Sequence, residues 1–137
     1  MNAPDIKVKT SLANLERALN RLGEALAEPE ENPLRVDAVI QRFEFAWEIF
    51  WKSLKRILAQ EGIETHTPRE ALKKAFAAYW LKDETVWLNM LKDRNTTSHV
   101  YDEAVAKKIV ERINDHYYGE MRQAQGGLTA RFGRRES

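Results

Sequence analysis

Apolar residues recur at steps of three and four along most of the chain, which is the period of an α-helix with one buried face. The first helix is expected to begin at Ser11 and to end before residues 28–33, because two prolines there lack an amide donor and disfavour helix in the preceding residue. Its apolar stripe consists of Leu12, Leu15, Leu19, Leu22 and Leu26. Residues 1–8 lack such a pattern, and we expect a loose lead-in.

The longest stripe predicts a second helix from about Leu34 to Glu61, followed by Gly62 as the residue just past its end. Its apolar positions are Val36, Ile40, Phe43, Trp47, Phe50, Leu54 and Ile57. Thr67-Pro68-Arg69-Glu70 then predicts a third helix, because Thr67 suits the N-cap, Pro68 the first position and Glu70 the third. The apolar side of this helix is expected to be Leu72, Phe76 and either Tyr79 or Trp80.

A further helix is expected to begin at Asp83 or Glu84 and to extend to Arg94. Its inward residues are predicted to be Trp87, Met90 and Leu91. The third and fourth helices together can form two kinked pieces of one bundle arm. The last helix is predicted from Asp102 to about Gln125, where Gly126-Gly127 would stop it. Its stripe repeats every four residues at Val105, Ile109, Ile113, Tyr117 and Met121.

No stretch alternates in the manner of a β-strand, so the sequence predicts an all-α, up-and-down four-helix bundle with one arm that can be split in two. Residues 1–137 are interpreted as a single helical domain with an ordered core over about residues 10–125. Residues 126–137 are expected to be a mobile basic tail.

Composition narrows the class of protein. Hydrophobic residues make up 43% and charged residues 31%, and no apolar run approaches the roughly 20 residues that span a bilayer. With no basic and apolar leader either, we expect a cytoplasmic protein. The absence of cysteine excludes disulfides and thiolate metal sites. A net charge of +1 gives no global attraction to nucleic acid, so RNA binding would require a local patch or a second subunit.

The segment from Leu91 to Glu103 departs from the amphipathic pattern. It holds Arg94, whose planar fork matches phosphate oxygens, and His99, which titrates near neutral pH and can give or take a proton. Tyr101 follows two positions later. In one unbroken helix these three side chains would not converge. Because residues 96–98 are hydroxyl residues that favour caps and turns, we place a helix end near Arg94 or Asn95 and a turn up to Tyr101, which could aim Arg94 and His99 into one pocket.

A purely structural reading of the same residues remains open. In it, Arg94 pairs with Asp93 or Asp102, His99 caps a helix and Tyr101 packs with its hydroxyl in water. His66 and His116 lack ligand partners one helical turn away, so no metal is assigned. No cofactor is expected, and the chain contains neither a Gly-rich phosphate loop nor the carboxylate cluster that a nucleotidyltransferase needs.

The second helix also carries a row beside its core stripe. Glu44, Glu48 and Lys52 repeat every four residues, next to the large apolar residues Phe45, Ile49 and Trp51. One interpretation is a solvent face with ion pairs between successive turns. The alternative is that the apolar members pack against a partner subunit, since exposed aromatic patches commonly mark interaction sites.

Three blocks of the sequence resemble a known family. Arg94-x4-His99-x-Tyr101 is similar to the motif of the HEPN superfamily, and the longer run from Asp93 through Asn95 to Glu103 resembles its nucleotidyltransferase substrate-binding branch. Two upstream blocks agree with this branch, Phe43 to Lys55 and Thr67 to Phe76. Trp47 and Phe50 are bulkier than the pattern, and Val100 stands where threonine is usual. The resemblance covers roughly residues 10–120.

The resemblance implies the toxin of a two-gene toxin-antitoxin pair that cleaves RNA without a metal. In this reading His99 is the general base or acid, Arg94 stabilises charge on the phosphate, and Asn95 and Asp93 orient them. The family pattern further implies a homodimer that joins two motifs, within a hetero-oligomer with a minimal nucleotidyltransferase that adds AMP to Tyr101. Substrate or partner binding is assigned to Glu44, Glu48, Trp51, Lys52 and Arg69. The alternative is a non-catalytic substrate-binding or regulatory subunit of a nucleotidyltransferase complex.

Overall fold

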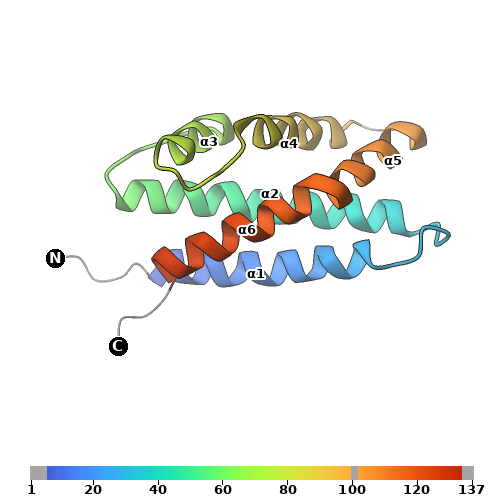
Figure 1. Ribbon diagram of the computed structural model, residues 1–137, viewed down its shortest axis with the longest axis horizontal. Coiled ribbons are helices and arrows are strands. Elements are labelled where there is room, and N and C mark those ends of the chain that lie inside the picture. Colours follow the sequence, from blue (N-terminus) through green and yellow to red (C-terminus); the bar gives the residue numbers. More distant parts are fainter. Residues whose placement is uncertain (1–5, 100–101, 134–137) are drawn as a thin grey trace.

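The computed structural model describes residues 6–99 and 102–133, and within these ranges the chain forms helices and no strand. The elements in chain order are α1 Ile6–Leu26, α2 Arg35–Gln60, α3 Pro68–Ala77, α4 Glu84–Thr97, α5 Glu103–Arg112, η1 Ile113–Tyr117, α6 Tyr118–Leu128 and η2 Thr129–Gly133, where η marks a π-helical turn. Figure 1 shows α3 and α4 following one another along α2, with α1 on the other side of α2 and the α5 to α6 arm crossing in front. The predicted all-α bundle is confirmed, and its third arm is the split one.

Large aromatic side chains of α4 and η1 pack against those of α2. The ring of Trp87 on α4 lies 4.7 Å from that of Phe50 and 6.5 Å from that of Trp47, both on α2. The ring of Tyr117 stacks 6.0 Å from that of Phe43. All five side chains are buried, which agrees with the apolar stripe predicted for the second helix. These contacts hold the start of α4 and η1 against α2.

Helix ends follow the predicted capping chemistry in two places. Gly62 adopts φ +87°, and the amides of Gly62 and Ile63 donate to carbonyl oxygens of the last turn of α2, which is the arrangement expected of a glycine just past a helix. At the start of α3, the Glu70 amide donates to the Thr67 hydroxyl and the Glu70 carboxylate accepts from the Thr67 amide. A further backbone hydrogen bond, from His66, lowers the pKa of the Glu70 carboxyl. The predicted capping box is confirmed.

The expected loose lead-in is wrong for residues 6–8. Helix α1 begins at Ile6, and Val8 is fully buried in the core one turn ahead of Leu12. A single valine between lysines gives too little pattern to reveal this from the sequence, because the burial depends on α1 reaching the far ends of α2 and η2.

The fourth arm is continuous from Glu103 to Gly133 but is not one α-helix. In an α-helix, apolar positions that repeat every four residues advance around the axis by about 40° per repeat, so a long stripe drifts away from the core. The π turn at Ile113–Tyr117 contains an extra residue per turn and takes up this drift. Ile109, Ile113 and Met121 are therefore all buried, whereas Val105, the first residue of the predicted stripe, is exposed.

The predicted stop at Gly126-Gly127 is wrong. Helix α6 passes through both glycines, and η2 continues to Gly133. Leu128 is buried, and the Phe132 ring meets the Trp80 ring edge-on at 5.2 Å. This packing offsets the cost of roughly 1 kcal/mol for each glycine in a helix. It also settles that Trp80 and not Tyr79 packs inward, since Tyr79 is exposed. Residues 126–133 of the predicted mobile tail are therefore helical. Residues 134–137 lie outside the described residues.

Candidate active site at the end of α4

Helix α4 extends two to three residues beyond the helix end predicted at Arg94 or Asn95, and it ends at Thr97. The Thr96 hydroxyl donates to the carbonyl oxygen of Lys92 at 3.1 Å, and the Thr97 hydroxyl lies 2.7 Å from the carbonyl oxygen of Arg94. These hydroxyls bond within the helix they were expected to interrupt. The turn is therefore shorter than predicted, and α5 follows with Asp102 as its N-cap, as its carboxylate accepts from the Ala104 amide.

Arg94 lies on the side of α4 that faces α2. Its guanidinium Nη1 is 3.6 Å from the Glu44 carboxylate and donates to the Ser98 hydroxyl at 2.9 Å. The same Glu44 carboxylate accepts from the Thr97 hydroxyl at 2.7 Å. Only 24% of the Arg94 side chain is exposed, and its Nε is buried without a partner among the described residues. The charge partner of Arg94 is thus Glu44, and not Asp93 or Asp102 as the structural reading had it.

Asp93 points into the bundle. Its carboxylate accepts two hydrogen bonds from the Arg112 guanidinium, at 2.7 and 2.9 Å, and one from the buried Tyr117 hydroxyl at 2.5 Å. The residue is only 8% exposed. Asp93 therefore ties the last turn of α4 to α5 and η1. Because both of its oxygens accept hydrogen bonds from Arg112 or Tyr117, Asp93 could orient Arg94 or His99 only indirectly, by fixing the position of α4.

The hydrogen-bonded cluster changes the proton affinities of its members. Burial and the adjacent Asp93 carboxylate raise the pKa of the Tyr117 phenol well above its ordinary value. The hydrogen bonds to Asp93 raise the pKa of the Arg112 guanidinium. Both shifts extend to higher pH the range over which Tyr117 stays neutral and Arg112 stays charged, as expected of a structural clamp.

His99 lies on a different side of the same helix end. Together with Asn95 it lines a cavity of about 620 Å³ between the start of α3 and the last turns of α4. The described residues that line it are Arg69, Leu88, Asn89, Leu91, Lys92, Asn95, Thr96 and His99. The charged members of this set, Arg69 and Lys92, are both cations, and the set includes no carboxylate. Such a cavity suits an anionic ligand with polar groups, and a titratable imidazole sits at its wall.

The structure therefore brings some of the predicted site residues together and separates others. His99, Asn95 and Arg69 share the cavity, whereas Arg94 does not line it and Asp93 is buried on the bundle side. The expectation that a turn aims Arg94 and His99 into one pocket of one chain is not met. Tyr101, the predicted modification site, lies outside the described residues together with Val100.

The second row on α2 divides into separate environments. Glu48 pairs with Lys52 at 3.5 Å on the solvent face, as the ion-pair interpretation predicts. Ile49 and Trp51 pack partly against the core, and Lys55 lies 6.0 Å from the Trp51 ring. Phe45 is 61% exposed. Phe45 is thus exposed, whereas Ile49 and Trp51 are partly covered by their own core, so the row is not one exposed apolar face.

Three residues important to this region were missed in the sequence. Arg112 and Tyr117 hold Asp93 across 19 and 24 residues of chain, a pairing with no local pattern to reveal it. Lys92, the second cation of the cavity, lies one turn before Thr96 on α4 and could have been found from the helical spacing of Lys92, Asn95 and His99.

Among residues 6–99 and 102–133, no three His, Asp or Glu side chains are grouped so that they could hold a metal ion. None of the helices in these ranges is both long and apolar enough to cross a membrane.

Known proteins share both the sequence pattern and the bundle. The pattern of the family described as "nucleotidyltransferase substrate binding protein like" matches residues 10–130. A probable ribonuclease HepT of Haemophilus influenzae is 32% identical over 85 residues, a match that covers 58% of each chain. The chain thus spans 58% of the length of that curated relative.

Two solved structures are similar over most of their length. A crystal structure from Thermus thermophilus has 37% sequence identity and a TM-score of 0.77, over 83% of this chain and 98% of that one. A tri-AMPylated HEPN toxin of Shewanella oneidensis, in complex with an MNT antitoxin, has 18% identity and a TM-score of 0.75, over 95% of this chain and 99% of that one.

The likeness to this toxin over 95% of the chain shows that the all-α bundle has the HEPN fold. The match over residues 10–130 gives the narrower assignment: the chain belongs to the nucleotidyltransferase substrate binding protein like family, as the three sequence blocks predicted.

Proposed function

We propose that this protein is the HEPN-type toxin of a two-gene pair and that it cleaves RNA without a metal ion. The observation that carries the proposal is the cavity beside His99, in which every charged side chain of the described lining is a cation. An RNA phosphate is the ligand that two cations, two asparagine amides and a neighbouring imidazole suit best. The similarity to a probable ribonuclease HepT and the fold of a HEPN toxin support the same reading.

The proposed reaction needs no external reagent. His99 removes the proton from a ribose 2′-hydroxyl, or gives one to the leaving 5′-oxygen, while the 2′-oxygen forms its bond to phosphorus and the bond from phosphorus to the 5′-oxygen breaks. Arg94 stabilises the charge that develops on the phosphate, and Asn95 donates to it from the cavity wall. Asp93 acts indirectly, by holding the turn of α4 that carries Arg94.

A twofold homodimer would complete this site. In one chain Arg94 is occupied by Glu44 and lies outside the cavity of His99, so the two motif residues do not converge. A second copy can supply the other half of a composite cleft, as closed symmetry allows. Because Ile49 and Trp51 pack against their own core, the dimer contact is better sought around the end of α4 than along the large apolar residues of α2.

Expression in a bacterial host tests the toxin proposal. The intact chain should arrest growth, and co-expression of a cognate minimal nucleotidyltransferase should relieve the arrest. Normal growth under strong expression of soluble protein would favour the non-catalytic alternative, a substrate-binding or regulatory subunit. That alternative draws on the family description and on the ion pair with Glu44, which engages Nη1 of the Arg94 guanidinium within the isolated chain.

The partner is proposed to silence the toxin by transferring AMP to Tyr101. The AMPylated state of the Shewanella toxin in complex with its MNT antitoxin motivates this step. The phenol oxygen of Tyr101 would attack the α-phosphorus of ATP and pyrophosphate would leave, which places a negative phosphate two residues from His99. That charge would compete with RNA for Arg94 and for the cations of the cavity.

Intact-mass measurement tests this modification. After incubation with the nucleotidyltransferase, ATP and Mg²⁺, the protein should gain AMP units, and the Tyr101→Phe variant should gain none. The variant should remain toxic in the presence of an active partner. Equal mass gain in both proteins would exclude Tyr101 as the acceptor.

A further inference from the structure

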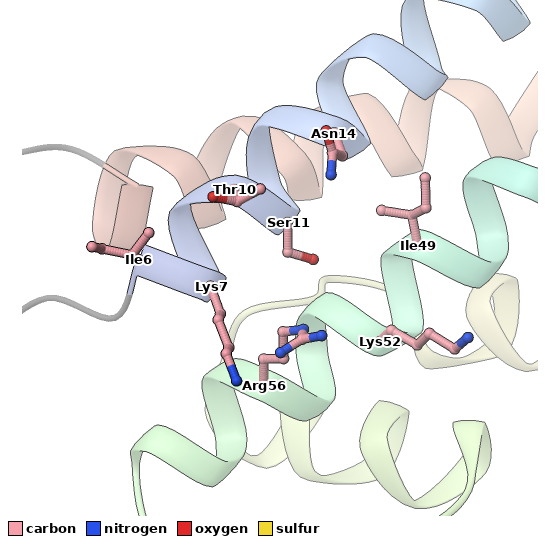
Figure 2. Close-up of a pocket in the computed structure, with 8 residues that line it drawn as sticks. All are labelled: Ile6, Lys7, Thr10, Ser11, Asn14, Ile49, Lys52 and Arg56. Atoms are coloured by element: carbon pink, nitrogen blue, oxygen red, sulfur yellow. The ribbon is translucent and has the colours of Figure 1, made fainter.

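A second basic surface lies between α1 and α2, where neither Arg94 nor His99 contributes to the lining. One cavity of about 290 Å³ is lined from α1 by Ile6, Lys7, Thr10, Ser11 and Asn14 and from α2 by Ile49, Lys52 and Arg56. Figure 2 shows the Lys7 side chain extending from α1 toward α2, where Lys52 and Arg56 arise. Three cations and several hydroxyl and amide groups therefore surround this cavity, and its described lining contains no carboxylate.

A second cavity, of about 370 Å³, lies farther along the same two helices and is lined by Ala18, Arg21, Gln41, Arg42 and Phe45. Phe45 is one turn from Ile49 on α2, and Ala18 is one turn from Asn14 on α1, so the two cavities follow one another. We call the two together the α1–α2 groove. From Lys7 to Arg21 it measures roughly 21 Å, at 1.5 Å per helical residue.

The charge of the groove stands out against the balance of the chain. Of the residues that the structure describes, five cations and no carboxylate line it, whereas the whole protein has a net charge of +1. Among the residues that the structure describes, Glu48 pairs with Lys52 at 3.5 Å and Glu24 pairs with Arg42 at 3.8 Å at the rim. Exposed pairs of this kind contribute little, so a phosphate can compete for the cations.

An exposed aromatic ring lies within the same groove. Phe45 is 61% exposed although it lies on α2, which contacts α1, α3, α4 and α5. A flat ring among cations is how proteins bind single-stranded nucleic acid, with bases stacked on the ring and the backbone held by charge. A duplex keeps its bases stacked inside, so it could use the cations but not the ring.

We propose that the α1–α2 groove binds a single-stranded segment of RNA, with Phe45 stacking on a base and Lys52 and Arg56 contacting phosphates. About three to four nucleotides fit its length, close to the smallest sites of single-strand binding folds. The inference rests on the proposed ribonuclease function, because it makes the groove an anchor for RNA whose cleaved bond lies in the His99 cavity. Charge and the exposed ring favour RNA over an acidic protein partner, which would need no stacking ring.

Binding to a 2′-O-methyl RNA 12-mer tests the groove without cleavage, because the blocked 2′-oxygen cannot attack. Fluorescence anisotropy should show that Lys52→Glu/Arg56→Glu weakens binding at least tenfold and lowers the salt slope by about 1.4, at roughly 0.7 per lost phosphate contact. Phe45→Ala should weaken single-strand binding about fivefold or more and leave duplex binding unchanged. The control Lys107→Glu/Lys108→Glu makes the same charge change on α5, outside both cavities, and should alter binding less than threefold.

Each other outcome has a definite meaning. If the α5 control weakens RNA binding as much as the groove variant does, the effect reflects only the loss of general positive charge, and the proposed binding site is wrong. If Phe45→Ala keeps RNA affinity but reduces self-association or binding of the nucleotidyltransferase, the groove is a protein interface and the inference is wrong. The probe cannot be cleaved, so it reports binding alone. A protein that binds the probe through the groove but cleaves no unmodified RNA would disprove the proposed catalytic function and would still support the groove as an RNA-binding site. Unchanged circular dichroism must accompany each variant.

Discussion

The end of α4 and the residues just after it place their side chains in two different environments. Asp93 is buried and its carboxylate is bound by Arg112 and Tyr117, whereas Asn95 and His99 are exposed and line an open cavity. Arg94 lies between them in sequence and is held against Glu44 of α2. One face of this helix end is thus fixed by the bundle, and the other is left available for chemistry.

This difference separates residues that hold the site from residues that would act in it. A carboxylate with three hydrogen bonds has little capacity left for a substrate, but it fixes the position of the helix that carries the motif. A helix end anchored on its inner face can present an imidazole to solvent without strain in the fold. The buried face should therefore govern stability, and the open face should govern activity.

The largest effect on stability is expected from Asp93→Ala, which leaves the Arg112 charge and the buried Tyr117 hydroxyl without their partner. Breaking such a pair costs about 3 to 5 kcal/mol when both charges are buried. Because the Arg112 side chain is 44% exposed, we expect a loss of about 2 to 3 kcal/mol in the free energy of unfolding. Urea denaturation measures it, with Asn95→Ala, expected within about 0.5 kcal/mol of wild type, as the matched control. Similar losses in both variants would contradict the distinction.

Arg94→Ala should affect both stability and activity. It removes the ion pair with Glu44 and the hydrogen bond to Ser98, so we expect a loss of about 1 to 2 kcal/mol together with the loss of RNA cleavage. Arg94→Lys keeps the charge near Glu44 but lacks the planar fork, and it should regain most of the stability and little of the cleavage. Full cleavage by a folded Arg94→Ala protein would remove Arg94 from the proposed reaction.

The smallest effect is expected from Tyr117→Phe, which removes one hydrogen bond to Asp93 and should cost about 1 kcal/mol at neutral pH. The pKa of Tyr117 is raised in the folded protein, so the folded state favours the neutral phenol. Its contribution is complete below the unfolded pKa of about 10 and is lost as pH rises toward the folded pKa. The stability difference between wild type and Tyr117→Phe should therefore shrink above pH 10. A difference independent of pH up to 11 would contradict the proposed clamp.

The sequence predicted those features whose cause is local. The stripe of α2, the capping box at Thr67 and Glu70, and the glycine after α2 follow from helical period and end chemistry, and the structure confirms them. The hydroxyl residues 96–98 likewise placed the candidate site near a helix end, and the resemblance to a family assigned roles to Arg94 and His99. What each motif residue contacts was not accessible in this way.

The errors arose where distant contacts override local preference. Gly126-Gly127 lies inside a helix because Leu128 and Phe132 pack against the core. Helix α1 begins earlier than predicted because Val8 is also buried in the core. Thr96 and Thr97 remain helical because their hydroxyls find carbonyls of the same helix and, for Thr97, Glu44 from 53 residues away. The separation of Arg94 from His99 follows from that extra turn.

Cleavage by the purified protein and by His99→Ala is the most direct test of the ribonuclease proposal. Both proteins would be prepared in parallel and incubated with a 5′-labelled single-stranded RNA, with and without EDTA. We expect wild type to cleave equally in both conditions and to leave a 2′,3′-cyclic phosphate, and we expect His99→Ala to fold with unchanged stability and to cleave at least a hundredfold more slowly. Undiminished cleavage by His99→Ala, or cleavage by wild type that EDTA abolishes, would contradict the account.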